Sequence, residues 1–316
     1  MSSYIIRRVL ASLLVIFLVS VFVFSIIHLL PGDPIKLALG DEATEEDVQR
    51  IREERHLNDP LPKQYWIWVT GLFKGDFGYS LLQNRPVSTM LAERLPRTIS
   101  LGLPAFLISV TIGILFGIIS AVKRGSFIDQ LITLMSTLGL GTPQFWIGML
   151  LIYVFGMVLN IFPIRGLVLP SEDFGGYIRS MILPVFCMSL HMIASVSRQT
   201  RSNMLEVVKQ DYIRTARANG LSEKKIIFGH ALKNALIPVV TYIGMQTRGI
   251  IGGSVMIESL FSIAGIGGLM REAIDTREYW VLQSCVLLLS FVAVFSNLIV
   301  DIVYGYIDPR IRESRR

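Results

Sequence analysis

The sequence predicts an all-α integral membrane protein with six transmembrane helices. Of its 316 residues, 52% are hydrophobic and 17% are charged, whereas a soluble domain carries about 25% charged residues. Long uncharged stretches alternate with short charged patches, which is typical of a chain that crosses a bilayer several times. The net charge of +6 belongs mainly to the two termini and one central loop, which indicates membrane topology and not nucleic-acid binding.

Six stretches are candidate spans, since a helix takes about 20 apolar residues to cross the hydrocarbon layer. The first follows Arg7 and Arg8, is too long for the core of a signal peptide and precedes no A-x-A cleavage pattern, so we expect a retained span. The third is too long for one straight helix and contains Gly139, Gly141 and Pro143, so we expect a break with the main span after Pro143. The predicted spans are 9–30, 98–122, a part of 131–164, 181–196, 235–257 and 280–300.

Basic residues predict the orientation. Lys and Arg are concentrated at both termini, at 123–124 and in the segment 198–233, and they are sparse in the short loops of the other side. By the positive-inside rule, the basic side is cytoplasmic. We therefore expect both termini inside and the segment 31–97 outside, which agrees with an even number of spans.

The outer segment contains a predicted helix with Thr44 as its N-cap and acids at 45–47, where they favour the helix dipole. The aromatic run at 65–68 follows two prolines. These aromatics fit a position at the membrane interface, and they fit the interior of a packed subdomain equally well.

The central cytoplasmic segment predicts two helices joined by a sharp turn. The first is expected over 206–219, with Gly220 at its C′ position. Ser222 is a candidate N-cap for a short second helix that begins with Glu223. Such a unit suits docking into another protein, and a solvated loop is the alternative.

Several motifs carry a family resemblance. The run DYIRTARANGLSEKKIIFGHALKNALIP, at 211–238, has Arg214-Thr215-Ala216 at the Glu-Ala-Ala place of the cytoplasmic motif of ABC importer permeases, and Gly220 at its glycine. It departs from the general pattern at Leu232-Lys233, where Leu-Pro is expected. The TARAxG and HALxNAxxP forms, the start YIIRRVLASLLVIFLVSVFVFSIIHLLPGDP and the end NLIVDIVYGYIDPRIR resemble the dipeptide, oligopeptide and nickel branch. The resemblance covers nearly the whole chain.

This resemblance implies the type I ABC importer permease fold with an appended N-terminal helix. The implied parts are an N-terminal transmembrane helix at 1–30, an extracytoplasmic segment at 31–97, a permease core with five transmembrane helices at 98–307 and a cytoplasmic tail at 308–316. The core includes the coupling segment 198–233. The implied location is a bacterial or archaeal cell (inner) membrane, with the N- and C-termini cytoplasmic.

The resemblance also implies partners. The sequence has no G-x-x-x-x-G-K-[ST] phosphate loop, so we expect no enzyme activity, cofactor or metal in this chain and ATP and Mg on partner ATPases. Implied partners are two ATP-binding subunits, a second homologous permease subunit, an extracytoplasmic substrate-binding protein and membrane lipid, without nucleic acid. The helix after Gly220 is the expected docking element, and the residues implied to couple are Arg214, Thr215, Ala216, Gly220, Leu221, Ser222, Glu223, Lys224 and Lys225.

The expected cargo is a di- or oligopeptide, with nickel, metallophore or glutathione import by the same mechanism as the alternative. Arg248 interrupts the fifth span, where a charge costs at least ~2.5 kcal/mol and normally faces a cavity or a partner. It is a candidate for binding a substrate carboxylate, and Arg248 and Glu258 are the candidate residues of the substrate path. A structural ion pair with Glu258, or with another acid, is the alternative. A membrane enzyme or a channel is disfavoured because the sequence shows no H-E-x-x-H or G-x-S-x-G motif and no repeated filter.

Overall fold

The computed structural model describes residues 2–29, 35–36 and 44–307. Within these residues the chain is almost entirely helical, with one two-stranded antiparallel hairpin. The elements are α1 (Ser2–Leu29), α3 (Glu45–Glu54), α4 (Leu61–Phe73), β1 (Tyr79–Ser80), β2 (Arg85–Pro86), α5 (Val87–Val122), α6 (Phe127–Gly141), α7 (Gln144–Leu151), the π-helix η1 (Ile152–Val158), α8 (Phe174–Val207), α9 (Asp211–Ala218), α10 (Glu223–Lys225), the π-helix η2 (Ile226–Ala231), α11 (Leu232–Leu260), α12 (Ile266–Asp275) and α13 (Tyr279–Ile307).

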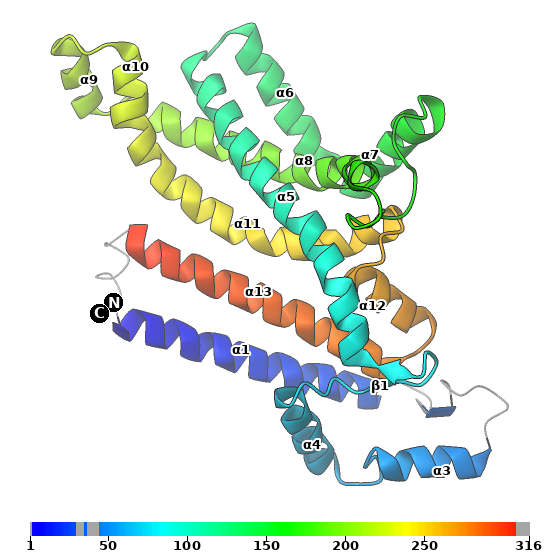
Figure 1. Cartoon of the computed structure of the whole chain (residues 1–316). Helices are drawn as coiled ribbons and strands as arrows, with labels where there is room; N and C mark the ends of the chain where they lie inside the picture. Colours follow the sequence, from blue (N-terminus) through cyan, green and yellow to red (C-terminus); the bar gives the residue numbers. More distant parts are fainter. Residues whose placement is uncertain (1, 30–34, 37–43, 308–316) are drawn as a thin grey trace.

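Five helical runs in the described residues are long and apolar enough to span a membrane, and α6 with α7–η1 forms a bent pair that makes a sixth. The long helices run in broadly the same direction (Figure 1). Helices α9 and α10 lie at one end of this bundle, and α3, α4, α12 and the hairpin lie at the other. This arrangement agrees with the predicted separation of a cytoplasmic and an extracytoplasmic segment.

The third span breaks where the sequence predicted. Helix α6 ends at Gly141 and α7 begins after Pro143, and the two arms meet at 107°. The prediction that the main span follows Pro143 is wrong. The arm after Pro143 has 8 α-helical and 7 π-helical residues, which makes it as long as the 15-residue helix α6 before the break. At about 1.5 Å per residue neither arm alone reaches across ~30 Å of hydrocarbon.

Two spans extend well past their predicted ends. Helix α5 begins at Val87 and not at 98, so the outer segment is shorter than 31–97 implies. Helix α8 begins at Phe174 and not at 181. Charged residues such as Glu93 and Arg94 end an apolar stretch, but they do not end a helix.

Helices α5 and α8 form the centre of the bundle and approach closely through small residues. A Cβ at Gly113 would lie 2.8 Å from Cβ of Val196, and one at Gly117 would overlap Thr200. Ser109 and Ser189 donate hydrogen bonds across the same contact, to the Ser189 and Ala105 carbonyls. Small residues of this kind let membrane helices meet at short range.

The appended helix α1 lies beside α13 (Figure 1). Arg8 and Asp301 form an ion pair of 2.7 Å near one end of the two helices. Near the other end, Ser20 and Tyr65 share a hydrogen bond of 2.7 Å that joins α1 to α4. Tyr65 and Trp68 pack against α1, whereas Trp66 is exposed, so the aromatic run is part of a packed subdomain and part of its surface.

The predicted cap of the outer helix is confirmed. Helix α3 begins at Glu45, and the Thr44 hydroxyl accepts a hydrogen bond from the amide of Asp47 at 3.1 Å. The same hydroxyl donates to the carboxylate of Asp47, which lowers the pKa of Asp47 below its ordinary value. The sequence therefore fixes the beginning of this helix by a local mechanism.

Candidate functional site

A short separate helix, α9, lies at the exposed end between α8 and α10. The predicted single helix over 206–219 is wrong, because α8 ends at Val207 and α9 begins at Asp211. Between them, Gln210 takes an extended conformation with ψ of 150°. No glycine or proline marks this break, so the sequence pattern did not reveal it.

Gly220 ends α9 in the predicted left-handed conformation, with φ of 75°. The amide of Gly220 donates to the carbonyl of Arg217 at 3.0 Å, and the amide of Leu221 donates to the carbonyl of Ala216 at 3.3 Å. This pair of bonds is a Schellman motif, which satisfies the last carbonyls of a helix and reverses the chain. Gly220 therefore sets the direction in which the chain leaves α9.

The segment after Gly220 differs from the prediction. Glu223 begins α10, but α10 continues through η2 into α11 without another break. Ser222 occupies the N-cap position and its side chain makes no cap hydrogen bond. The separate short helix is thus the one before Gly220, and the expected short helix after it is the first turn of a long one.

Buried apolar side chains attach α9 to the bundle. Ile213 of α9 is fully buried in a cluster with Met204 of α8 and Ile226 of η2. Asn234 of α11 donates a hydrogen bond of 2.8 Å to the Tyr212 hydroxyl. The position of α9 is therefore coupled to both α8 and α11.

The implied coupling residues form an exposed surface around this turn. Ala216 and Leu221 are half-buried beside the cluster, and the other implied residues are exposed. Glu223 forms an ion pair of 2.7 Å with Arg217, which joins α10 to α9 across the turn. Two aromatic residues on the same segment, Tyr212 and Phe228, are also exposed, at 42% and 59%, and were not among the predicted coupling residues. The signal for them in the sequence is their residue type, because aromatic residues are enriched at protein interfaces.

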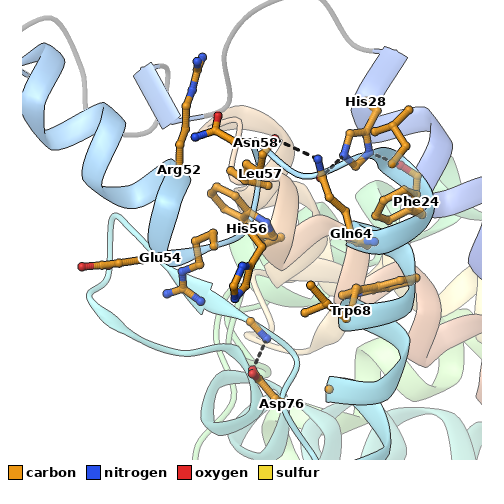
Figure 2. A pocket seen from close by; sticks show the side chains of 17 residues that line it. Phe24, His28, Arg52, Glu54, His56, Leu57, Asn58, Gln64, Trp68 and Asp76 are labelled. Carbon is orange, nitrogen blue, oxygen red and sulfur yellow. Dashed lines mark hydrogen bonds between the residues drawn. The ribbon is translucent and has the colours of Figure 1, made fainter.

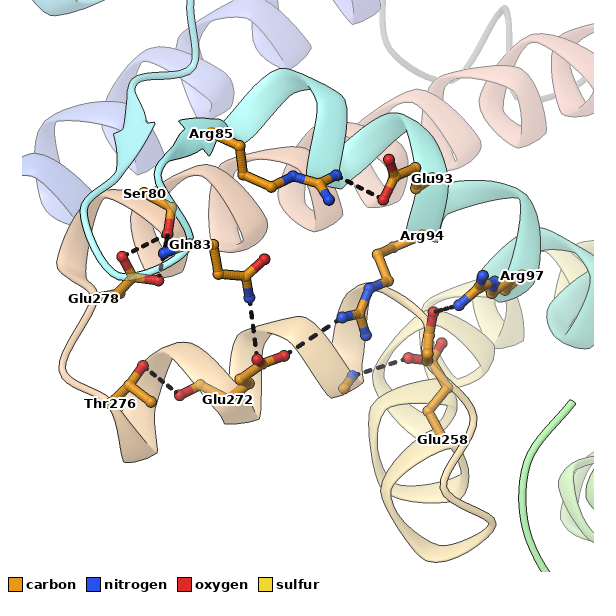
Figure 3. Close-up of polar contacts among 12 residues, drawn as sticks. Ser80, Gln83, Arg85, Glu93, Arg94, Arg97, Glu258, Glu272, Thr276 and Glu278 are labelled. Atoms are coloured by element: carbon orange, nitrogen blue, oxygen red, sulfur yellow. Dashed lines mark hydrogen bonds and ion pairs between the residues drawn. The ribbon is translucent and has the colours of Figure 1, made fainter.

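Glu258 has a structural position at the opposite end of the bundle. Its side chain is fully buried, and one carboxylate oxygen accepts hydrogen bonds from the amides of Gly267 and Gly268 at 2.7 and 3.1 Å (Figure 3). Glu258 thus satisfies the free amides at the N-terminus of α12. Arg248 lies in α11, and its side chain lies outside the described residues.

Further polar contacts attach α12 and the chain around it to α5 and the hairpin. Buried Glu278 accepts hydrogen bonds from the Ser80 hydroxyl and the Leu82 amide. Glu272 faces Gln83 and Arg94 in the same network (Figure 3). These contacts fix the α12 end of the core as one unit.

A cavity of about 580 Å³ opens among α1, α3, α4 and α13 at that end. Gln64 lies in its wall, where Nε2 of His28 donates to the Gln64 amide oxygen at 3.1 Å (Figure 2). Its lining includes two arginines and two acids, together with Trp68 and Trp280. Because the positive and negative side chains in this lining are equal in number, the cavity does not favour an anionic or a cationic ligand. Among the described residues no cluster of three His, Cys, Asp or Glu side chains could hold a metal ion.

Comparison with known proteins gives consistent matches. Residues 113–313 match the family described as binding-protein-dependent transport system inner membrane component, and residues 1–102 match its N-terminal companion. The chain is 39% identical to the oligopeptide transport system permease protein of Bacillus subtilis, over 98% of this chain and 99% of that protein. It is 37% identical to the glutathione transport system permease protein of Escherichia coli K12, over 99% of both. A crystal structure of an amino acid ABC transporter with histidines superposes with a TM-score of 0.50 at 16% identity, over 71% of this chain and 94% of that one, and shows the fold alone.

Proposed function

Since the chain belongs to the family of inner membrane components of binding-protein-dependent transport systems, we propose that it imports small peptides as one half of a translocation path. It is a multi-pass membrane permease, and such a permease works with an ATPase and a substrate-binding protein. The observation that carries the peptide assignment is the likeness to the oligopeptide permease, which extends over nearly the full length of both chains.

The proposed complex contains this chain, a second homologous permease subunit, two ATP-binding subunits that hold ATP and Mg, and an extracytoplasmic binding protein. The N- and C-termini lie in the cytoplasm, so α9 faces the ATPase. The geometry supports α9 as the docking helix, because it is short, separate and exposed. Its attachment to α8 and α11 through Ile213 carries a movement of the ATPase into two long helices.

The division of the chain follows the same scheme. The outer segment after α1 ends at the hairpin, and the permease core begins with α5 at Val87. The five-span core, predicted over 98–307, therefore begins at 87 in the proposal, and the additional turns of α5 contact α12 and the chain just before it. Residues 308–316 are the proposed cytoplasmic tail and lie outside the described residues.

Reconstitution tests the proposal. The assembled importer in liposomes, with the binding protein outside and ATP inside, is expected to accumulate a radiolabelled tripeptide. An ATPase subunit that lacks its phosphate-loop lysine is the matched control and is expected to abolish uptake. ATP-independent uptake by this chain alone would contradict the proposal.

Glutathione is the second candidate cargo, because a glutathione permease of similar length is 37% identical. Glutathione is a tripeptide whose first peptide bond is made through the γ-carboxyl of glutamate, so the two cargoes share peptide bonds and a free C-terminal carboxylate but not the same backbone. A competition assay separates the two cargoes. If micromolar unlabelled glutathione blocks uptake and the same concentration of unlabelled alanine tripeptide does not, glutathione is favoured as the cargo.

A further inference from the structure

A groove of about 660 Å³, lined mostly by polar and charged residue types, runs between α5, α6 and α8 near the α9 end of the bundle. Helix α6 contributes Thr133, Ser136 and Thr137, whose spacing places them on one face. The opposite face of α6 is apolar and exposed, with Met135 and Leu138 more than half exposed. Polar side chains in a span normally face a water-filled cavity or a protein partner and not lipid. The two faces of α6 therefore have different surroundings.

Helix α8 supplies the charge of the groove. Arg201 is neutralised, because Asp129 of α6 binds it bidentately at 2.8 and 2.9 Å. Asp129 also accepts bonds from the Ser120 hydroxyl and the Gly125 amide, so its carboxylate is fully engaged. Arg198 is exposed in the groove and forms no ion pair within the part of the chain that the structure describes.

The position of Arg198 fits a cytoplasmic mouth. It lies about 36 Å along α8 from Phe174, at about 1.5 Å per residue, whereas the hydrocarbon layer is ~30 Å thick. Lys209 and Glu206 also line the groove and balance each other in formal charge. Arg198 is therefore the uncompensated charge at the point where the groove reaches the cytoplasm.

We propose that this groove is the cytoplasmic part of the substrate path and that Arg198 attracts the carboxylate of the passing substrate. The inference rests on the proposed peptide import. A guanidinium binds a carboxylate bidentately. Its exposure keeps this binding weak, since water screens an exposed ion pair, and a path must release what it binds.

Thiol labelling of the assembled importer in inside-out vesicles tests the groove without transport. Cys187 and Cys285 are fully buried, so the native background is low. Thr137 and Ser202 both line the groove. Thr137→Cys and Ser202→Cys are therefore expected to react with water-soluble methanethiosulfonates added from the cytoplasmic side. Met135→Cys, on the opposite face of α6, is the matched control and is expected to react slowly. Equal rates for Met135→Cys and Thr137→Cys, or unreactive groove positions, would overturn the groove as an aqueous path.

The charge of Arg198 is tested at Ser202→Cys, one helical turn away. The introduced thiol is expected to react faster with an anionic sulfonatoethyl reagent than with a cationic trimethylammonioethyl reagent. Arg198→Gln should lower the ratio of these two rates, the charge preference, about fivefold. The control variant Arg124→Gln, at an exposed arginine outside the groove, should leave the charge preference unchanged.

Protection by peptides is the second test of Arg198. Millimolar trialanine should slow the labelling of Ser202→Cys more than the C-terminal amide of trialanine does. An unchanged preference in Arg198→Gln, or equal protection by both peptides, would refute the role of Arg198. Failure of peptide uptake with intact labelling would instead refute the proposed cargo.

Discussion

At Gly220 the backbone alone decides what a substitution does. A Cβ there would have no heavy atom within 4 Å, so no side chain would need to move. The positive φ remains, and an L-residue pays roughly 1–2 kcal/mol in that region. A substitution at this position therefore acts on the direction of the chain after α9 and leaves the packing of the spans unaffected.

Gly220→Ala is expected to reduce transport severalfold while the protein still inserts in the membrane. The strained turn moves the exposed face of α9, so ATPase subunits should co-purify poorly or hydrolyse ATP without uptake. Gly229→Ala is the matched control, since Gly229 also has open space around it and has no positive φ. Transport, ATPase activity and subunit co-purification are measured for both variants. Equal activity of the two variants would contradict the role of this turn.

At the scale of the elements, capping and turn residues predicted where helices begin and end better than the limits of the apolar stretches did. The Thr44 cap and the Gly220 turn follow from side-chain and backbone preferences, and both are present. The start of α5 at Val87 and the break before α9 depend on tertiary contacts, which a single sequence does not show. For the candidate site, the exposed turn was predictable, whereas the attachment of α9 through Ile213 and the contact of Glu258 with α12 required the fold.

Glu258→Ala is expected to loosen α12 from α11 and lower the stability of the purified protein. Two amides at the start of α12 would lose a buried acceptor, and an unsatisfied buried group costs about 1–3 kcal/mol. Thermal unfolding can be followed with a thiol-reactive dye, because Cys187 and Cys285 become accessible only when the bundle opens. The apparent melting temperature should fall by several degrees. Glu272→Ala, which removes an exposed acceptor in the same network, should change it by less, and the reverse order would contradict the structural role of Glu258.

For the whole molecule, α3 and α9 lie at opposite ends of the bundle (Figure 1). The basic flanks predicted this polarity, and the arrangement of helices agrees with it. Which end faces the cytoplasm follows from charge alone, so it remains a prediction.

Cysteines placed at the two ends should therefore label from opposite sides. Glu46→Cys in α3 is expected to react with an impermeant maleimide added outside intact cells, and Lys224→Cys in α10 only after the cells are opened. Both positions are exposed, so accessibility does not distinguish them. The reverse pattern would refute the proposed orientation.

The close contact between α5 and α8 also constrains how this sequence can change over evolution. Gly117 faces Thr200 with no room for even one additional carbon atom, and Gly113 meets Val196 in the same way one turn earlier. A larger residue at position 117 is compatible with this fold only if position 200 becomes smaller or the two helices separate. In an alignment of relatives, positions 117 and 200 should therefore vary together, although they are distant in sequence and neither is expected to bind the cargo.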